Sequence, residues 1–221
     1  MTARIKSLPK YTKKEEIFNS LSHLIGLFFA IGVFVFFLIY HVTNSIQFIK
    51  MLPYYFYALS MAVVFYVSSM YHSSKFSSVK RAIFRLIDHC DIYVFVFGTY
   101  LPLCLYGVAN KNIATAVIII EIVLMISGIV LNLIPSDSKI VKILSYLIYL
   151  IDGWLIIFFY PFNLGMDFFV FLFILLGGIT YSIGAIVYAI GKKKRYFHTI
   201  FHIFVVLAAA LQFIGIYFLL V

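Results

Sequence analysis

The sequence predicts an all-α membrane protein: a bundle of seven transmembrane helices with the N-terminus cytoplasmic and the C-terminus outside. Of its 221 residues, 64% are hydrophobic and only 11% are charged, and the mean hydropathy is +1.08. Seven apolar stretches are each long enough to cross a bilayer, and the basic residues gather on one side of them. A soluble domain of this length could not bury so much apolar surface, so the solvent must be lipid.

Each predicted span reaches the length of about 20 mostly apolar residues that crossing the hydrocarbon layer requires. In chain order, the spans are expected at about 17–42, 53–72, 87–107, 113–134, 140–160, 168–190 and 198–221. The connections carry turn and charged residues and lie at 43–52, 73–86, 108–112, 135–139, 161–167 and 191–197. The first span follows a basic segment, as in a signal peptide, but it is too long for one and is expected to be retained. The connections leave no room for a soluble domain, so residues 1–221 are expected to form one membrane domain.

Lysine and arginine predict the orientation, because cytoplasmic connections are enriched in them. Fifteen of the 17 belong to the N-terminal segment or to the second, fourth and sixth connections and their borders. Only Lys50 and Lys111 fall on the other side. The N-terminus is therefore expected in the cytoplasm of a multi-pass protein of the cell membrane. The net charge of +9 is interpreted as this orientation signal and as contact with anionic headgroups, so no nucleic-acid partner is expected.

Three histidines and an aspartate are expected at one depth in the inner leaflet. His72 ends the second span, Asp88 opens the third, and His198 and His202 open the seventh. Ser68 lies one turn deeper than His72. Since successive spans alternate in direction, all of these helix ends face the cytoplasmic side. Ionisable groups inside a membrane are costly and indicate function when they face the bundle interior.

The chemistry of this set favours zinc. His198 and His202, four residues apart on one helical face, can chelate one cation. Together with His72 they make three histidine ligands with a fourth position left to water, the pattern of a catalytic zinc site. A nearby carboxylate such as Asp88 would orient that water or accept its proton. The alternative is a set of interfacial histidines that bind no metal.

Five motifs resemble those of the hemolysin III and progestin/adipoQ receptor (adiponectin receptor-like) family. They occur in the family's order, cover essentially the whole chain and point to the bacterial hemolysin III branch. They are the segment Glu16–Gly26, Ser68-x3-His72, Leu86-Ile87-Asp88-His89 followed by Gly98–Pro102, Gly153-Trp154, and His198-x3-His202.

The resemblance implies seven helices, a cytoplasmic N-terminus and a zinc ion held by His72, His198 and His202. It further implies that Asp88 hydrogen-bonds the zinc-bound water and that Ser68 is a polar neighbour of the site. Members of the family are similar to alkaline ceramidases, which implies hydrolysis of a lipid amide.

Two aspartates depart from the family pattern. Asp91 stands where a small residue is common, and we expect it to pair with another buried polar group or to act as an added acid near the site. Asp152 precedes Gly153-Trp154 where an apolar residue is usual, and it needs a partner that the sequence does not name. Glu121 is expected to be a paired or pore-facing carboxylate.

A polar stripe begins the first span. Glu16, Asn19 and His23 are spaced by three and four residues, so they share one helical face. This face is expected either to line the site or to join the first span to the bundle by packing and capping contacts.

The leading functional hypothesis is a zinc-dependent intramembrane hydrolase of lipid amides or esters, with Asp88 and Ser68 as its catalytic residues. Its partners would be membrane lipids, which enter the site laterally. One alternative is a membrane lipid sensor or regulator in which zinc is structural, with the basic residues 192–195 coupling headgroup charge to the histidines. A second is a cytolytic pore-forming protein, although no polar stripe runs down the length of a span to line a water-filled channel.

Overall fold

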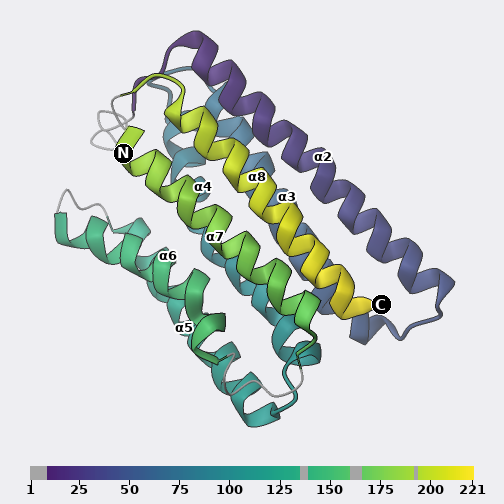
Figure 1. The fold of residues 1–221 in the computed structure, drawn as a ribbon. Coiled ribbons are helices and arrows are strands. Elements are labelled where there is room, and N and C mark those ends of the chain that lie inside the picture. Colours follow the sequence, from purple (N-terminus) through teal and green to yellow (C-terminus); the bar gives the residue numbers. More distant parts are fainter. Residues whose placement is uncertain (1–8, 135–138, 160–165, 192–193) are drawn as a thin grey trace.

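The computed structural model describes residues 9–134, 139–159, 166–191 and 194–221, and every regular element within these ranges is a helix (Figure 1). In chain order the elements are α2 (Lys13–Thr43), α3 (Phe48–Ser73), α4 (Val79–Pro102), η1 (Leu103–Gly107), α5 (Lys111–Leu133), α6 (Lys139–Phe159), α7 (Phe168–Gly191) and α8 (Phe197–Leu220). The short π-helix η1 continues α4 directly. The predicted all-helical fold is confirmed for the described residues.

Six helical segments are long and apolar enough to cross a membrane, namely α2, α3, α4 together with η1, α5, α7 and α8. The apolar part of α6, Ile143–Leu155, is shorter, so the seventh crossing stays a prediction. Large apolar side chains such as Phe28, Val42 and Ile186 are more than half exposed on the outward faces. Soluble proteins rarely expose apolar surface on this scale, which indicates that lipid covers these faces.

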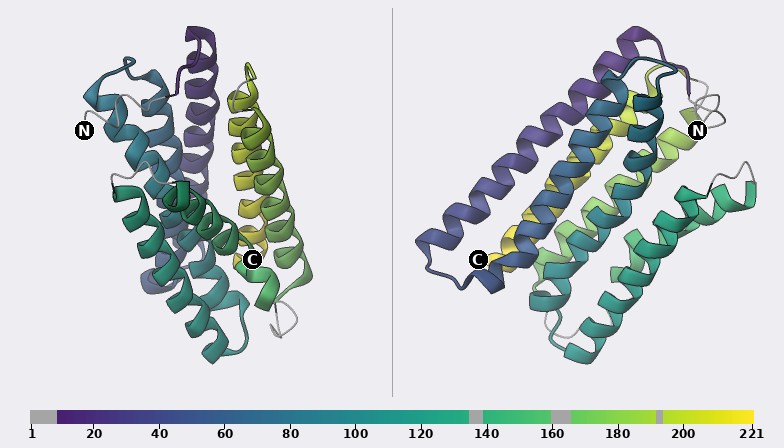
Figure 2. Two further views of the ribbon diagram at one scale, coloured as in Figure 1. Left: turned by 90° about the vertical axis from the view of Figure 1, so that its left-hand side faces the viewer. Right: turned by 180° about the vertical axis from the view of Figure 1, so that it is seen from behind.

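The order of the helices in space decides which helix ends meet. α3 packs between α2 and α4, and α5 lies beside α4 (Figures 1 and 2). The last helix, α8, packs against both α7 and α2. Because α2 and α8 begin at the end of the bundle where α3 finishes, these three helix ends lie together (Figure 1).

The predicted connection 73–86 is mostly helical, which corrects the expected start of the third span. α4 begins at Val79, not at position 87. The Ser78 side chain caps this start, because its hydroxyl accepts a hydrogen bond from the Arg81 backbone N–H at 3.1 Å. Long basic side chains such as Lys80 can lie along apolar surface while their charge reaches water, so a helix tolerates them at the interface.

The first two helices also begin earlier than predicted. α2 begins at Lys13 because Thr12 and Glu15 form a capping box, in which each side chain pairs with the other's backbone N–H. α3 begins at Phe48, and Pro53 lies in its second turn instead of opening it. The missing N–H of Pro53 costs one helical hydrogen bond near the helix start. The remaining helix ends agree with the prediction to within two residues.

A close approach of α2 to α3 fixes the face that α2 presents to the bundle. A Cβ atom at Gly26 would lie 2.6 Å from the Phe65 ring, so only glycine allows this contact. Small residues at helix contacts commonly let membrane helices approach in this way. Nearer the start of α2, the hydroxyls of Ser20 and Ser69 lie 3.1 Å apart. These contacts turn Glu16 and the residues of its stripe toward the end of α3.

The orientation is a prediction that a reporter can test. Basic residues near the start of α2 and the start of α4 lie at the same end of the bundle, whereas Lys50 and Lys111 lie near the opposite end. A reporter fused after Val221 should therefore be extracytoplasmic. One inserted within 192–195, of which 192 and 193 lie outside the described residues, should be cytoplasmic. Reversed results at the two positions would contradict the orientation, and cytoplasmic reporters at both positions would contradict the seven-span count.

Candidate metal centre

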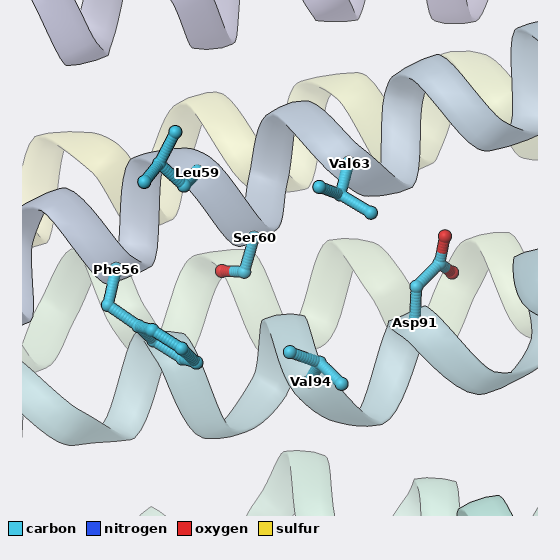
Figure 3. Close-up of a pocket in the computed structure, with 6 residues that line it drawn as sticks. All are labelled: Phe56, Leu59, Ser60, Val63, Asp91 and Val94. Carbon is cyan, nitrogen blue, oxygen red and sulfur yellow. The ribbon is translucent and has the colours of Figure 1, made fainter.

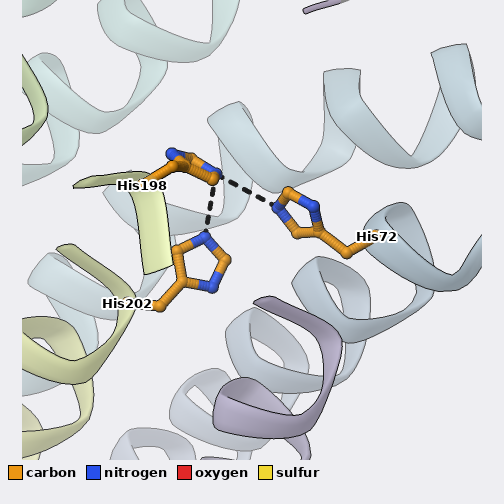
Figure 4. Close-up of side chains that lie close together, drawn as sticks. All are labelled: His72, His198 and His202. Atoms are coloured by element: carbon orange, nitrogen blue, oxygen red, sulfur yellow. Dashed lines mark hydrogen bonds between the residues drawn. The ribbon is translucent and has the colours of Figure 1, made fainter. Parts of the chain in front are cut away.

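Three histidines converge where α3 ends and α8 begins. His72 lies in the last turn of α3, and His198 and His202 lie one turn apart in α8 (Figure 4). Nε2 of His198 lies 3.2 Å from Nε2 of His72 and 3.0 Å from Nε2 of His202. One ring nitrogen from each histidine lies within 4.8 Å of the others, so the three could hold one metal ion. His72 and His202 are buried and His198 is half-buried.

Hydrogen bonds behind two of the rings decide which nitrogen faces the centre. Nδ1 of His72 donates to Glu16 Oε2 at 2.7 Å, and Nδ1 of His202 donates to the backbone oxygen of Asn19 at 3.3 Å. A carboxylate and a carbonyl can only accept, so both Nδ1 atoms carry the proton. The Nε2 atoms of these two rings therefore present lone pairs to the centre, as metal-binding imidazoles require.

The spacing of the nitrogens fits a tetrahedral metal ion. Zn–N bonds of about 2.0–2.1 Å at tetrahedral angles place two ligand nitrogens about 3.3 Å apart. The two measured separations of 3.2 and 3.0 Å are close to this value. Lone pairs at such distances repel each other unless a proton or a cation lies between them. The donor set, three neutral imidazoles, is the one that zinc commonly takes in catalytic sites.

An ion pair between Glu16 and Arg81 supports the His72 ring. Glu16 contacts Arg81 of α4 through its second carboxylate oxygen. Arg81 is only 1% exposed, donates to the Ser74 backbone oxygen at 3.0 Å and lies over the Tyr71 ring at 4.8 Å. A charge-assisted network of this kind keeps Glu16 an acceptor for His72. It also joins α2, α3 and α4 beside the centre.

The polar stripe of α2 faces the three histidines, and the same contacts join α2 to α3, α4 and α8. Besides the contact of Glu16 with His72, the Asn19 side-chain oxygen accepts a hydrogen bond from the Thr199 hydroxyl at 2.5 Å. His23 stacks on His202 with ring centroids 3.9 Å apart. Both ring nitrogens of His23 are buried without a hydrogen-bond partner among the described residues. Asn19 and His23 therefore line the centre from the bundle interior.

Two tyrosines and an arginine near the histidines are missed by sequence reasoning. The Tyr11 ring stacks on His198 at 4.8 Å, and burial raises the pKa of Tyr11, so it stays a neutral aromatic cover. Tyr196 has a φ of 65° directly before α8, and its N–H donates to Glu15 at 2.8 Å. Neither tyrosine belongs to a recognisable motif. Left-handed backbone positions are usually occupied by glycine or asparagine, so a tyrosine there is not expected from the sequence. In the sequence, Arg81 is counted only among the basic residues that predict the orientation in the membrane.

Asp88 and Ser68 lie together on the seam between α3 and α4. Their side chains are within hydrogen-bonding reach, and Ser68 is one turn from the ligand His72. No direct hydrogen bond joins Asp88 to the three imidazoles within the described part of the chain. The structure therefore places Ser68 one turn from His72 and Asp88 next to Ser68.

The other buried carboxyl groups lie away from the histidines. Glu121 on α5 faces Asp152 on α6, and both are fully buried. None of their four oxygens has a hydrogen-bond partner among the described residues, so the two groups are neighbours across the α5–α6 contact. The expected pairing of Asp91 is not found. Its carboxyl group has no hydrogen-bond partner among the described residues and neighbours only the like group of Asp88.

Comparisons with known proteins find a matching family and relatives that are similar over nearly their full length. The model of the family described as "Haemolysin-III related" matches residues 11–213. The chain is 34% identical to "Hemolysin-3 homolog" of Bacillus subtilis (strain 168), over 94% of this chain and 95% of that one. It is 31% identical to "Hemolysin-3" of Bacillus cereus, over 99% and 97% of the two chains.

Proposed function

Because the chain belongs to the haemolysin-III-related family of multi-pass membrane proteins, we propose that its histidine centre binds zinc and hydrolyses lipid amides or esters. One observation carries this proposal. Three imidazole nitrogens converge within 4.8 Å while acceptors on α2 occupy the opposite nitrogens of two of the rings. That arrangement presents three ligands and leaves other coordination positions to water and substrate, as catalytic zinc sites do.

His72, His198 and His202 would hold the ion. Zinc supplies a Lewis acid that polarises a carbonyl group and makes a nearby water molecule more acidic. Glu16 and Asn19 keep two of the imidazoles oriented, and mutation of such outer partners commonly weakens metal binding.

Asp88 supplies the proton chemistry in this proposal. Its carboxylate would accept a proton from the attacking water and later return it to the leaving amine or alcohol. The Ser68 hydroxyl, within hydrogen-bonding reach, would keep the Asp88 carboxylate turned toward the centre. Both residues lie on helices whose outward faces meet lipid, which suits a substrate that arrives from the membrane.

A sensor with structural zinc is the second candidate, and one observation favours it. The turn before the ligand helix α8 carries the left-handed Tyr196, which Glu15 of α2 holds through the Tyr196 N–H. Backbone strain at a site can favour a change between two conformations. In this alternative, lipid charge sensed near Lys194 and Arg195 would shift α8 relative to α2 without any turnover.

Metal removal and restoration test the hydrolase directly. Purified protein should contain about one zinc per chain by elemental analysis, and it should release fatty acid from at least one member of a panel of ceramides and phospholipids. Release should disappear after chelation and return with added zinc, because the ion supplies the Lewis acid. Fully zinc-loaded protein that releases no fatty acid from any lipid of the panel would contradict the hydrolase.

A further inference from the structure

A cavity of about 270 Å³ lies between α3 and α4, outside the histidine centre, and a buried carboxyl group lines it. Its lining residues are Phe56, Leu59, Ser60, Val63, Asp91 and Val94 (Figure 3). Leu59 is 53% exposed and Val63 47% exposed, so the cavity opens on the face of the bundle that lipid covers. A molecule that occupies it must therefore come from the membrane.

Asp91 is the one charged side chain among these lining residues. It is only 5% exposed, and neither of its oxygens has a hydrogen-bond partner among the described residues. The backbone amides of its own turn lie nearby, but in a helix they bond to carbonyl groups one turn earlier. The Ser60 hydroxyl donates to the Tyr57 backbone oxygen. A buried carboxyl group left unsatisfied is costly, so this cavity calls for a ligand that brings a donor.

The position of the cavity defines the shape of that ligand. Asp91 lies six residues beyond Arg85, about 9 Å further along α4. From Asp91 the lining continues through Val63 and Leu59 to Phe56, away from the basic end of the bundle (Figure 3). A lipid whose headgroup lies level with Arg85 would have the first polar groups of its chain near Asp91 and its alkyl chain along the apolar lining.

We propose that the α3–α4 cavity binds a membrane lipid that carries an amide N–H or a hydroxyl at the head of its alkyl chain, with that donor hydrogen-bonded to Asp91. Carboxyl oxygens accept hydrogen bonds in either protonation state, so a donor on the lipid is the required complement. The alkyl chain would fill the space beside Phe56, Leu59 and Val63. This binding holds whether or not the histidine centre turns over a substrate.

Photolabelling with two matched probes tests the proposal in protein reconstituted into nanodiscs. One probe is a long-chain secondary amide with a diazirine on its alkyl chain, and the other is the same molecule methylated on nitrogen. The secondary amide should label peptides from 56–63 and 91–94. N-methylation should weaken labelling about tenfold, the change expected for one lost hydrogen bond to a buried carboxyl group.

Three variants and a control locate the contact. Asp91→Leu should weaken labelling by the secondary amide about tenfold, whereas Asp91→Asn, which keeps an acceptor oxygen, should weaken it roughly threefold or less. Val94→Phe should block labelling by filling the cavity. Val123→Phe, on a lipid-exposed face of α5, should leave labelling unchanged. Zinc content and thermal stability establish that each variant is folded.

Several outcomes would overturn the proposal. Equal labelling by the two probes would show that the cavity binds alkyl chains without a hydrogen bond from the amide N–H to Asp91. Labelling that spreads evenly over the outward helix faces, or that survives both Asp91→Leu and Val94→Phe, would exclude a site at this cavity. A dimer whose contact surface covers α3 and α4 and excludes both probes would assign the cavity to a second copy of the chain.

Discussion

Replacing His72, His198 or His202 by alanine is expected to remove most of the zinc from the purified protein. Each histidine supplies one of three converging nitrogens, with Nε2 separations of 3.0 and 3.2 Å from His198 to the other two. Two imidazoles compete poorly with buffer for the ion. The loss of affinity should therefore exceed the 10- to 100-fold that changes in outer hydrogen-bond partners typically cause. Elemental analysis after gel filtration measures this directly.

His41→Ala is the matched control for these three variants. His41 lies at the other end of α2, where its Nδ1 lies 2.7 Å from the Tyr55 hydroxyl, so its removal should leave zinc unchanged. The ligand variants should also lose the part of their thermal stability that zinc provides, because an ion that binds only the folded state adds to the free energy of unfolding. Full zinc occupancy in any of the three would exclude that histidine as a ligand.

Two simple rules predict from the sequence that the three histidines share one depth in the membrane. A spacing of four places His198 and His202 on one face, and alternating span direction brings the end of α3 to the same depth. Contact between them also requires α8 to pack beside α2, and spacing does not determine helix order. Members of one family share the order of their helices in space. The family predicted from the ordered motifs is confirmed by the family match.

The surroundings of the ligands were less predictable for identifiable reasons. Counting basic residues treats all of them as orientation signals, so it does not distinguish the buried Arg81 from an exposed lysine. The neighbour of Asp152 is Glu121, 31 positions earlier, and only the α5–α6 packing brings the two together. Asp91 was expected to pair, yet its position on the α3–α4 seam leaves it facing a cavity instead.

Asp88→Asn is the second variant with a large expected effect, and it separates the hydrolase from the sensor. Asparagine keeps the size of the side chain and a hydrogen bond to Ser68, but it cannot accept a proton. General-base catalysis is typically worth about 10²–10⁴ in rate, so lipid hydrolysis should fall by that factor. Zinc affinity should fall by no more than about 10- to 100-fold, and saturating zinc compensates for that loss.

Glu121→Gln serves as the control for this change. It makes the same replacement of a carboxyl by an amide in a fully buried membrane residue, but on α5, beside Asp152 and away from the histidines. Hydrolysis by Glu121→Gln should therefore stay near the wild-type rate. A general loss of activity in both variants would indicate damage to the fold and not a role in catalysis.

The decisive comparison measures lipid hydrolysis and the in-cell membrane phenotype for wild type and Asp88→Asn at saturating zinc. If the protein is a hydrolase, Asp88→Asn should lose both lipid hydrolysis and the membrane phenotype, because the phenotype then depends on turnover. A sensor with structural zinc keeps its phenotype in Asp88→Asn, because occupancy of the three histidines is unchanged and no proton needs to move. Hydrolysis that survives the substitution would remove Asp88 from the role of base, and a phenotype that survives with no hydrolysis in either protein would favour the sensor.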